Sequence, residues 1–335
     1  MAVRPDLEWL RREFDATIES FLTERGRRLP EASDLIAEIR RVVAAGGKRL
    51  RPAFCYWGCR AAGGAHGDDI VRLASSFELL HTFAIVHDDI MDAAPQRRGQ
   101  DSTVARLGVS QALLVGDLAL VLADAAFWSA AFPPEVLASA FEDFTMMREE
   151  VIAGQHLDVI ATGRDIDQDH ARLIARLKSG SYSIEHPLLI GARLAGAPAV
   201  LVDGLRRAGR PLGEAFQLRD DLLGLFGDPA TTGKPADSDI REGKRHLPYA
   251  LTVARLRGDE REWFVRSWGR GPDLTLAEVD SLRALVESSG ARAETEALTA
   301  DLAAQAAAAL EPLDIAPDAQ EALRELIDAA VVRVR

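Results

Sequence analysis

Apolar residues recur at three- and four-residue spacings along nearly the whole chain, which is typical of helices with one buried face. Leu73, Phe77, Leu80 and Ala84 form one such series. Alternating apolar and polar residues, which would predict strands, are hard to find. The spacing therefore predicts an all-α chain, with helices at roughly 6–25, 31–45, 51–62, 68–93, 101–131, 134–162, 167–180, 183–195, 198–227, 246–257, 275–287, 291–310 and 317–333.

Breaks between the predicted helices fall at glycine- and proline-rich steps such as Gly63-Gly64 and Pro133-Pro134. No polar linker is long enough to separate two domains, so we expect residues 1–335 to form one helical domain. The polar run 228–245 mixes Gly, Pro, Lys and Asp and is too long for a simple helix connection. We therefore expect a functional loop there.

Composition and charge narrow the class of protein. Of 335 residues, 47% are apolar and 27% are charged, which suits a folded chain with a sizeable core. The net charge of −12 repels polyanions, so neither nucleic acid nor an anionic membrane is an expected partner. An anionic ligand would have to be held by a local group of cations or by a metal ion.

Several features favour a cytoplasmic protein. The first residues lack the apolar core of a secretory signal, and the two cysteines, Cys55 and Cys59, are spaced for one buried helix face rather than for disulfides. The most apolar stretch, 113–132, is interrupted by Asp117 and Asp124. We interpret that stretch as a buried helix rather than a membrane span.

Acidic residues stand where the pattern predicts buried helix faces. Asp88 and Asp92 lie one helical turn apart after an apolar run, and two such carboxylates repel each other unless a cation lies between them. Asp220 and Asp221 repeat this arrangement after a second apolar run. We therefore expect the two helices to face each other across a metal-filled cavity. Oxygen ligands without His or Cys favour Mg²⁺ or Mn²⁺, which often share their shell with phosphate.

Cationic residues accompany these acids. The segment 46–52, GGKRLRP, carries three positive charges on a glycine-led turn into a helix, where backbone N–H groups can bind an anion. Arg97 and Arg98 follow the first acidic motif closely. Lysines mark three later segments, at Lys178, Lys234 and Lys244. In so acidic a chain, these placements favour two polyanionic groups, at least one of them bridged by metal.

Taken together, these motifs resemble the trans-isoprenyl diphosphate synthases of the polyprenyl synthetase family, most closely a bacterial geranylgeranyl or farnesyl diphosphate synthase. Eight motifs occur in the family's order and approximate spacing: GGKRLRP at 46–52, HDDIMD at 87–92, RRG at 97–99, GQHLD at 154–158, KSG at 178–180, FQLRDDLLGLFGD at 216–228, GKP at 233–235 and DIREGK at 239–244. The resemblance implies a single-domain bundle of long antiparallel helices around a central pocket, usually a homodimer.

The resemblance also implies a reaction. Such an enzyme condenses isopentenyl diphosphate with an allylic diphosphate by Mg²⁺-dependent ionisation and head-to-tail 1′-4 chain elongation. Three Mg²⁺ ions, or Mn²⁺ in their place, would be held by Asp88, Asp92 and Asp220, with Asp89 assisting and Asp221 and Asp239 acting mostly through water. The residues implied for the allylic diphosphate are Arg97, Lys178, Lys234 and Lys244, and those for isopentenyl diphosphate are Lys48, Arg51, His81 and Arg98.

Further roles come from the same resemblance. Gln155 and Asp158 would complete the polar shell. The main-chain carbonyl of Lys178, the hydroxyl of Ser179 and the amide oxygen of Gln217 would face the carbocation.

The chain departs from the family pattern at a few positions. Gly224 stands where many relatives have a third Asp in the second acidic motif, and whether Asp228 replaces that carboxylate is left open. Ser179 and His246 stand where threonine is common. Phe83 and Ala84, five and four residues before Asp88, imply geranylgeranyl diphosphate as the product, with farnesyl or a longer polyprenyl diphosphate as the alternative.

Two other classes share this scaffold. A class I terpene cyclase uses one substrate and needs no second diphosphate site, so Lys48, Arg51 and Arg98 argue against it. A non-catalytic partner subunit would typically have lost acids from one or both motifs, whereas Asp88 and Asp220 are both present.

Overall fold

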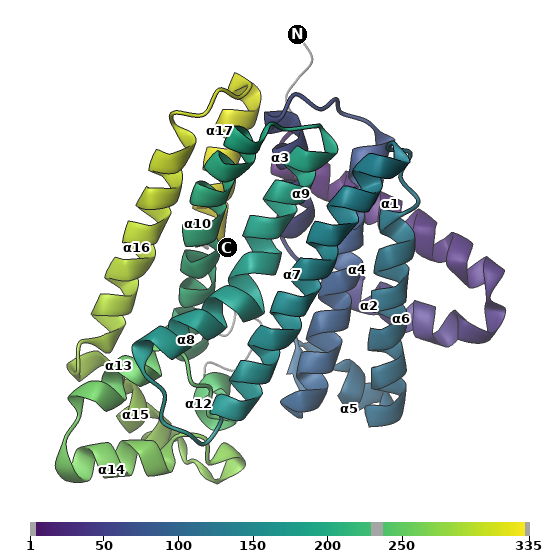
Figure 1. Cartoon of the computed structure of the whole chain (residues 1–335). Coiled ribbons are helices and arrows are strands. Elements are labelled where there is room, and N and C mark those ends of the chain that lie inside the picture. Colours follow the sequence, from purple (N-terminus) through teal and green to yellow (C-terminus); the bar gives the residue numbers. More distant parts are fainter. Residues whose placement is uncertain (1–4, 229–236, 332–335) are drawn as a thin grey trace. The chain divides into compact units, whose positions relative to one another are not determined.

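The computed structural model describes residues 5–228 and 237–331, which are mostly helical, and the prediction of an all-α chain is confirmed (Figure 1). The chain divides into two compact units. The first comprises Met1–Phe144, His186–Leu205 and Leu313–Leu326, and the second comprises Thr145–Glu185, Arg206–Pro312 and Ile327–Arg335. The single-domain expectation, like the expectation that the two acidic motifs face each other, stays a prediction.

The first unit is built around α4, which packs against α1, α2, α3 and α6. Figure 1 shows α4 and α6 side by side. Because neighbours cover it on several sides, α4 is mostly apolar from Ile70 to Leu80, and the first acidic motif lies in its last turns. Its elements are α1 (Leu7–Arg28), η1 (Pro30–Ala32), α2 (Ser33–Ala44), α3 (Leu50–Ala61), α4 (Asp68–Met91), β1 (Gln96–Arg97), β2 (Gln100–Asp101), α5 (Thr103–Leu107), α6 (Val109–Phe127) and α9 (His186–Leu194).

The second unit packs α8, α14, α15 and α16 around α13. Tyr249, Phe264 and Trp268 stack at the centre of its core, with ring centroids 5.1–5.6 Å apart. Its elements are α8 (Gln168–Ile174), the π-helix η2 (Ala175–Glu185), α12 (Ser238–Glu242), α13 (Leu247–Arg255), α14 (Gly258–Ser267), η3 (Gly271–Asp273), α15 (Leu276–Ser288) and α16 (Ala291–Leu310). The division into units falls within α7 (Pro134–Ala161), α10 (Ala199–Phe226) and α17 (Pro317–Val331).

The structure corrects five details of the predicted elements. The helix predicted at 101–131 is broken at Gly108, whose positive φ of 76° separates α5 from α6. A short hairpin, 96–101, precedes it. The run 228–245 contains α12. α14 lies where no helix was predicted, because half of its ten residues are charged and it buries only Phe264 and Ser267. The helix predicted at 167–180 continues as the π-helix η2.

The prediction that 113–132 is a buried helix is wrong for one face of α6. Leu114 and Val121 are 54% and 61% exposed, and Trp128, at the C-cap, is 46% exposed. A spacing of seven residues places the three on one side of the helix. Within the described ranges, α6 is the one helix that is long and apolar enough to cross a membrane, and 39% of its most apolar window is buried.

Candidate active site

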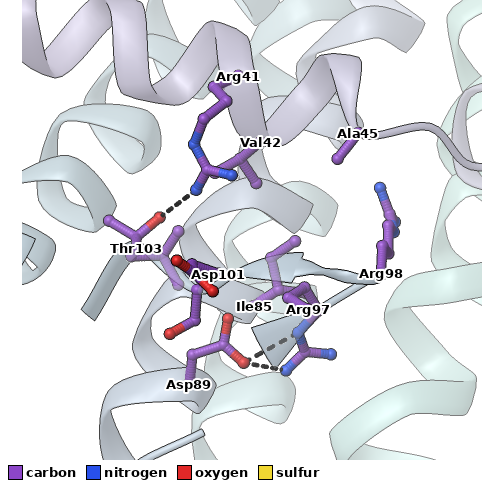
Figure 2. A pocket seen from close by; sticks show the side chains of 11 residues that line it. Arg41, Val42, Ala45, Ile85, Asp89, Arg97, Arg98, Asp101 and Thr103 are labelled. Carbon is purple, nitrogen blue, oxygen red and sulfur yellow. Dashed lines mark hydrogen bonds and ion pairs between the residues drawn. The ribbon is translucent and has the colours of Figure 1, made fainter. Parts of the chain in front are cut away.

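The first acidic motif lies at the carboxyl end of α4, where the hairpin brings an arginine against it. Arg97 on β1 donates from Nε to Asp89 Oδ1 at 2.9 Å (Figure 2). Its Nη2 also donates to Asp88 Oδ2 at 3.2 Å. Asp89 is 2% exposed. Burial alone would lower the pKa of Arg97, but the two carboxylates raise it, so the guanidinium stays charged. Asp89 therefore serves to hold Arg97, while Asp88 is shared and more exposed.

The turn between β1 and β2 places the side chains of Arg97 and Arg98 against different partners. Arg98 and Gly99 both have positive φ, 53° and 72°, as a two-residue turn of type I′ requires. Arg97 thereby meets the acids of α4, whereas Arg98 donates to the carbonyl oxygen of Gly46. A cavity of about 10 Å³, room for about one water molecule, lies behind this hairpin and is lined by both arginines and by Asp101 (Figure 2).

The cationic turn 46–52 is held by a buried arginine. Arg49 is 4% exposed and adopts the left-handed conformation, φ 53°, as the residue that precedes α3. It donates to Asp15 Oδ1 at 2.7 Å, to Glu78 Oε2 at 3.0 Å, to the Val43 carbonyl at 2.7 Å and to the Gly46 carbonyl at 3.3 Å. These contacts tie the turn to α1, α2 and α4. Lys48 and Arg51 flank Arg49 and are half-buried.

His81 joins this cationic group from α4. Arg98 Nη2 lies 3.5 Å from His81 Nε2. Burial, together with the charges of Arg51 and Arg98, lowers the pKa of His81 well below its ordinary value, so the ring is neutral and Nε2 accepts. Burial also lowers the pKa of Arg98 to about 10. The structure thus brings three of the predicted isopentenyl diphosphate residues together, with Lys48 on the same turn.

The second unit gathers the other predicted acids. Lys178 Nζ donates to Asp158 Oδ2 at 2.6 Å, and Gln217 Nε2 donates to Asp221 Oδ1 at 2.6 Å. Burial raises the pKa of Asp221 well above its ordinary value. The hydrogen bond from Gln217 opposes this shift, and the neighbouring carboxylates Asp239, Asp220 and Asp158 add to it. Such mutual repulsion is relieved when a cation enters.

The donors suit Mg²⁺ that is shared with a ligand. Within residues 5–228 and 237–331, no three His, Cys, Asp or Glu side chains converge closely enough to hold a metal ion by themselves. Mg²⁺ commonly takes one or two carboxylates and completes its shell with phosphate oxygens and water. Asp88 with Asp92 in the first unit, and Asp220 with its neighbours in the second, therefore fit Mg²⁺ that arrives with a diphosphate.

Lys178 is placed by a close backbone contact. A Cβ at Gly154 on α7 would overlap the backbone of Leu177 and Lys178, so only glycine lets η2 approach α7 so closely. Gly154 lies one turn before Asp158, which explains how Lys178 reaches that carboxylate. π-helical segments are frequent at functional sites, and η2 carries both Lys178 and the buried Ser179.

Four of the remaining predicted residues lie within the described part of the chain, and one lies outside it. Lys244 Nζ lies 3.3 Å from Glu242 Oε2, and Gln155 is half-buried on α7. Phe83 is half-buried and its ring meets the His87 ring edge-on at 4.9 Å. Ala84 is also half-buried. Lys234 lies outside the described residues.

Two residues were missed by the sequence reasoning. Arg49 was counted only as one of three positive charges. The available signal for its role was that the helix after it begins without Ser, Thr, Asp or Asn at the N-cap. His246, for which the sequence offered no role, precedes α13, and its Nδ1 accepts the N–H of Tyr249 at 3.2 Å. The proline two residues later, at N2 of α13, was the signal for a helix start there.

On an all-α protein, carboxylates, arginines and lysines arranged in this way are typical of metal-dependent enzymes that act on diphosphates. Comparison with known proteins specifies the family: the sequence profile of the polyprenyl synthetase family matches residues 33–280, and the chain belongs to this family. The predicted family and isoprenoid-synthase fold are confirmed. The chain is a trans-prenyltransferase of the isoprenyl diphosphate synthase type, as predicted.

Individual relatives agree with this assignment. The chain is 36% identical over 250 residues to the (2E,6E)-farnesyl diphosphate synthase of Mycobacterium tuberculosis, covering 73% of this chain and 68% of the relative. It is 32% identical to the geranylfarnesyl diphosphate synthase of Aeropyrum pernix, covering 88% and 92%. The crystal structure of geranylgeranyl pyrophosphate synthase from Corynebacterium glutamicum, complexed with isoprenyl diphosphate and magnesium, matches with a TM-score of 0.93 and 32% identity, covering 98% and 100%.

Proposed function

We propose that this enzyme is a cytoplasmic, Mg²⁺-dependent synthase that extends an allylic diphosphate with isopentenyl diphosphate, with geranylgeranyl diphosphate as its product. One observation carries the two-substrate reaction. Consecutive arginines serve two kinds of site in the first unit: Arg97 is bound to the acids of α4, whereas Arg98 joins His81 and the cationic turn. The first suits a diphosphate bridged by metal, and the second suits a metal-free diphosphate.

The roles of the chain's own residues follow from their chemistry. Mg²⁺, three ions per site in this proposal, supplies neutralisation of the departing allylic diphosphate when it is bound. Asp88, Asp92 and Asp220 hold the ions, and Arg97, Lys178, Lys234 and Lys244 bind the allylic diphosphate oxygens. Cations aimed at the leaving group favour breaking of the allylic C–O bond, because negative charge develops there in the transition state.

The second half of the reaction forms the new bond. Lys48, Arg51, His81 and Arg98 hold isopentenyl diphosphate so that its C4 attacks the allylic C1. The new C–C bond uses the electrons of the double bond, and the proton lost from C2 goes to the departing diphosphate. The Lys178 carbonyl, the Ser179 hydroxyl and the Gln217 amide oxygen face the allylic cation and stabilise its charge.

The decisive experiment incubates the purified chain with Mg²⁺, isopentenyl diphosphate and, in separate reactions, dimethylallyl, geranyl or farnesyl diphosphate. The expected product is C20, resolved by chromatography. Lys48→Ala should raise KM for isopentenyl diphosphate at least tenfold and should leave KM for the allylic diphosphate nearly unchanged. Arg27→Ala, at an exposed arginine of α1, is the matched control. Equal effects of Lys48→Ala on both KM values would contradict the two-site assignment, and absence of any elongation would contradict the function.

We further propose that two copies pair through the exposed face of α6. Leu114, Val121 and Trp128 form an apolar stripe, which would be covered in a homodimer of the kind that the family resemblance implies. Val121→Glu should shift the mass measured by light scattering from dimer to monomer. Leu276→Glu, at an apolar residue of α15 that is 73% exposed, is the control. A wild-type monomer at micromolar concentration would refute this pairing.

A further inference from the structure

A glycine lies inside α10 where a helix disfavours it. Gly224 follows Asp220 by one turn, and glycine in a helix interior is less stable than alanine, so its presence calls for a reason. The structure supplies one. A Cβ built at Gly224 would overlap the carboxylate of Asp239, from Oδ2 to Cγ. The Asp239 side chain thus occupies the space in which any other residue at position 224 would begin.

Asp239 is held in this place by the anchoring of α12. Ile240 is fully buried, and its carbonyl accepts the N–H of Gly269 at 2.9 Å. Arg241 pairs with Asp237 at 2.5 Å and donates to the carbonyls of Gly271 and Leu274 at 3.0 and 2.8 Å. α12 is therefore fastened on the side away from Asp239.

The position of the Asp239 carboxylate matters because of the helical period. Residues four apart lie one turn from each other on the same face, so position 224 stands to Asp220 as Asp92 stands to Asp88. A carboxylate resting on Gly224 lies where a third aspartate of the second motif would have started. Asp228 follows the end of α10 at Phe226.

A second observation points to a ligand beside this carboxylate. His246 is 8% exposed, and because its Nδ1 accepts the N–H of Tyr249, the neutral ring carries its proton on Nε2. Burial lowers the pKa of His246 to about 4, and Asp239 is the first of the charged neighbours that oppose this shift. Among the described residues, His246 Nε2 has no hydrogen-bond partner. A buried N–H donor without a partner suits a bound water or a phosphate oxygen.

We infer that Asp239 supplies the third carboxylate of the second acidic motif, delivered from α12 into the space that Gly224 leaves open. This inference rests on the proposed Mg²⁺-dependent function. It makes Gly224 and Asp239 an interdependent pair, and it assigns to Asp239, rather than to Asp228, the place of the missing aspartate.

The test moves the carboxylate from position 239 to position 224. Wild type, Asp239→Ala, Gly224→Asp and the double variant Gly224→Asp/Asp239→Ala are compared by thermal unfolding with inorganic pyrophosphate across a Mg²⁺ titration, and by Mn²⁺ binding in electron paramagnetic resonance. Asp239→Ala should raise the half-saturating Mg²⁺ concentration at least tenfold, and the double variant should return it to within about threefold of wild type. Gly224→Asn/Asp239→Ala is the uncharged control and should not recover.

Thermal unfolding in EDTA tests, without any metal, whether a side chain at position 224 and the Asp239 carboxylate occupy the same space. Gly224→Asp should lower the melting temperature in the wild-type background and much less in the Asp239→Ala background. Equal effects in both backgrounds would overturn the inference, as would a tenfold loss of Mg²⁺ affinity in Asp228→Ala with none in Asp239→Ala. If wild type forms no prenyl product but this EDTA comparison behaves as expected, the function fails while the shared space stands.

Discussion

Removing the Arg49 guanidinium should both destabilise the first unit and disturb one substrate site. Arg49 and Glu78 form a buried ion pair, with side chains 3% and 5% exposed and a separation of 3.0 Å. Arg49→Met keeps the bulk of the side chain but leaves the Glu78 charge buried without this partner. Loss of one partner of a buried pair costs about 3–5 kcal/mol. For a cooperative unit of 150–250 residues this corresponds to a fall in melting temperature of roughly 6–20 °C.

The double variant separates the buried charge from lost packing. Arg49→Met/Glu78→Leu removes both partners, and replacing a buried pair by apolar side chains is often close to neutral. It should therefore unfold at a higher temperature than Arg49→Met alone, measured by circular dichroism. Because Arg49 holds the turn that carries Lys48, both variants should raise KM for isopentenyl diphosphate more than KM for the allylic diphosphate. A double variant no more stable than Arg49→Met, or unchanged KM values in both, would refute the reasoning.

Three further outcomes are expected. Asp88→Ala should lower kcat by several orders of magnitude in a steady-state assay with little change in melting temperature; a loss of less than tenfold, about 1.4 kcal/mol in the barrier, contradicts a metal-binding role. Phe83→Ala should lengthen the product and Ala84→Phe should shorten it, as read by chromatography; unchanged lengths would place the end of the hydrocarbon pocket elsewhere. Because burial lowers the pKa of His246 from 6.5 to about 4, its contribution to unfolding free energy is present above pH 6.5 and is lost as the pH falls toward 4, by about 3 kcal/mol. His246→Thr, which keeps a helix cap, should show a shallower fall in urea titrations over this range, and an equal slope would count against a buried neutral ring.

Local patterns in the sequence account for most of the helices but not for their interruptions. The apolar spacing of α4 predicted a helix ending near the acids, because a long, largely apolar segment of this kind is typical of a core helix. α14 gave no such signal, since its stability comes from few buried residues. The hairpin that carries Arg97 was also missed, because each of its strands has only two residues, too few to show alternation of apolar and polar positions.

The sequence by itself determined the fold class and the family and indicated the candidate acids and cations of the site, since these follow from residue type and spacing. Only the tertiary structure decided which partner each charge meets. Arg97 binds Asp89, Arg49 binds Glu78 and Asp239 rests on Gly224, and these paired residues are 8, 29 and 15 positions apart in the chain. Such contacts depend on how helices pack and turns point, which no local pattern encodes.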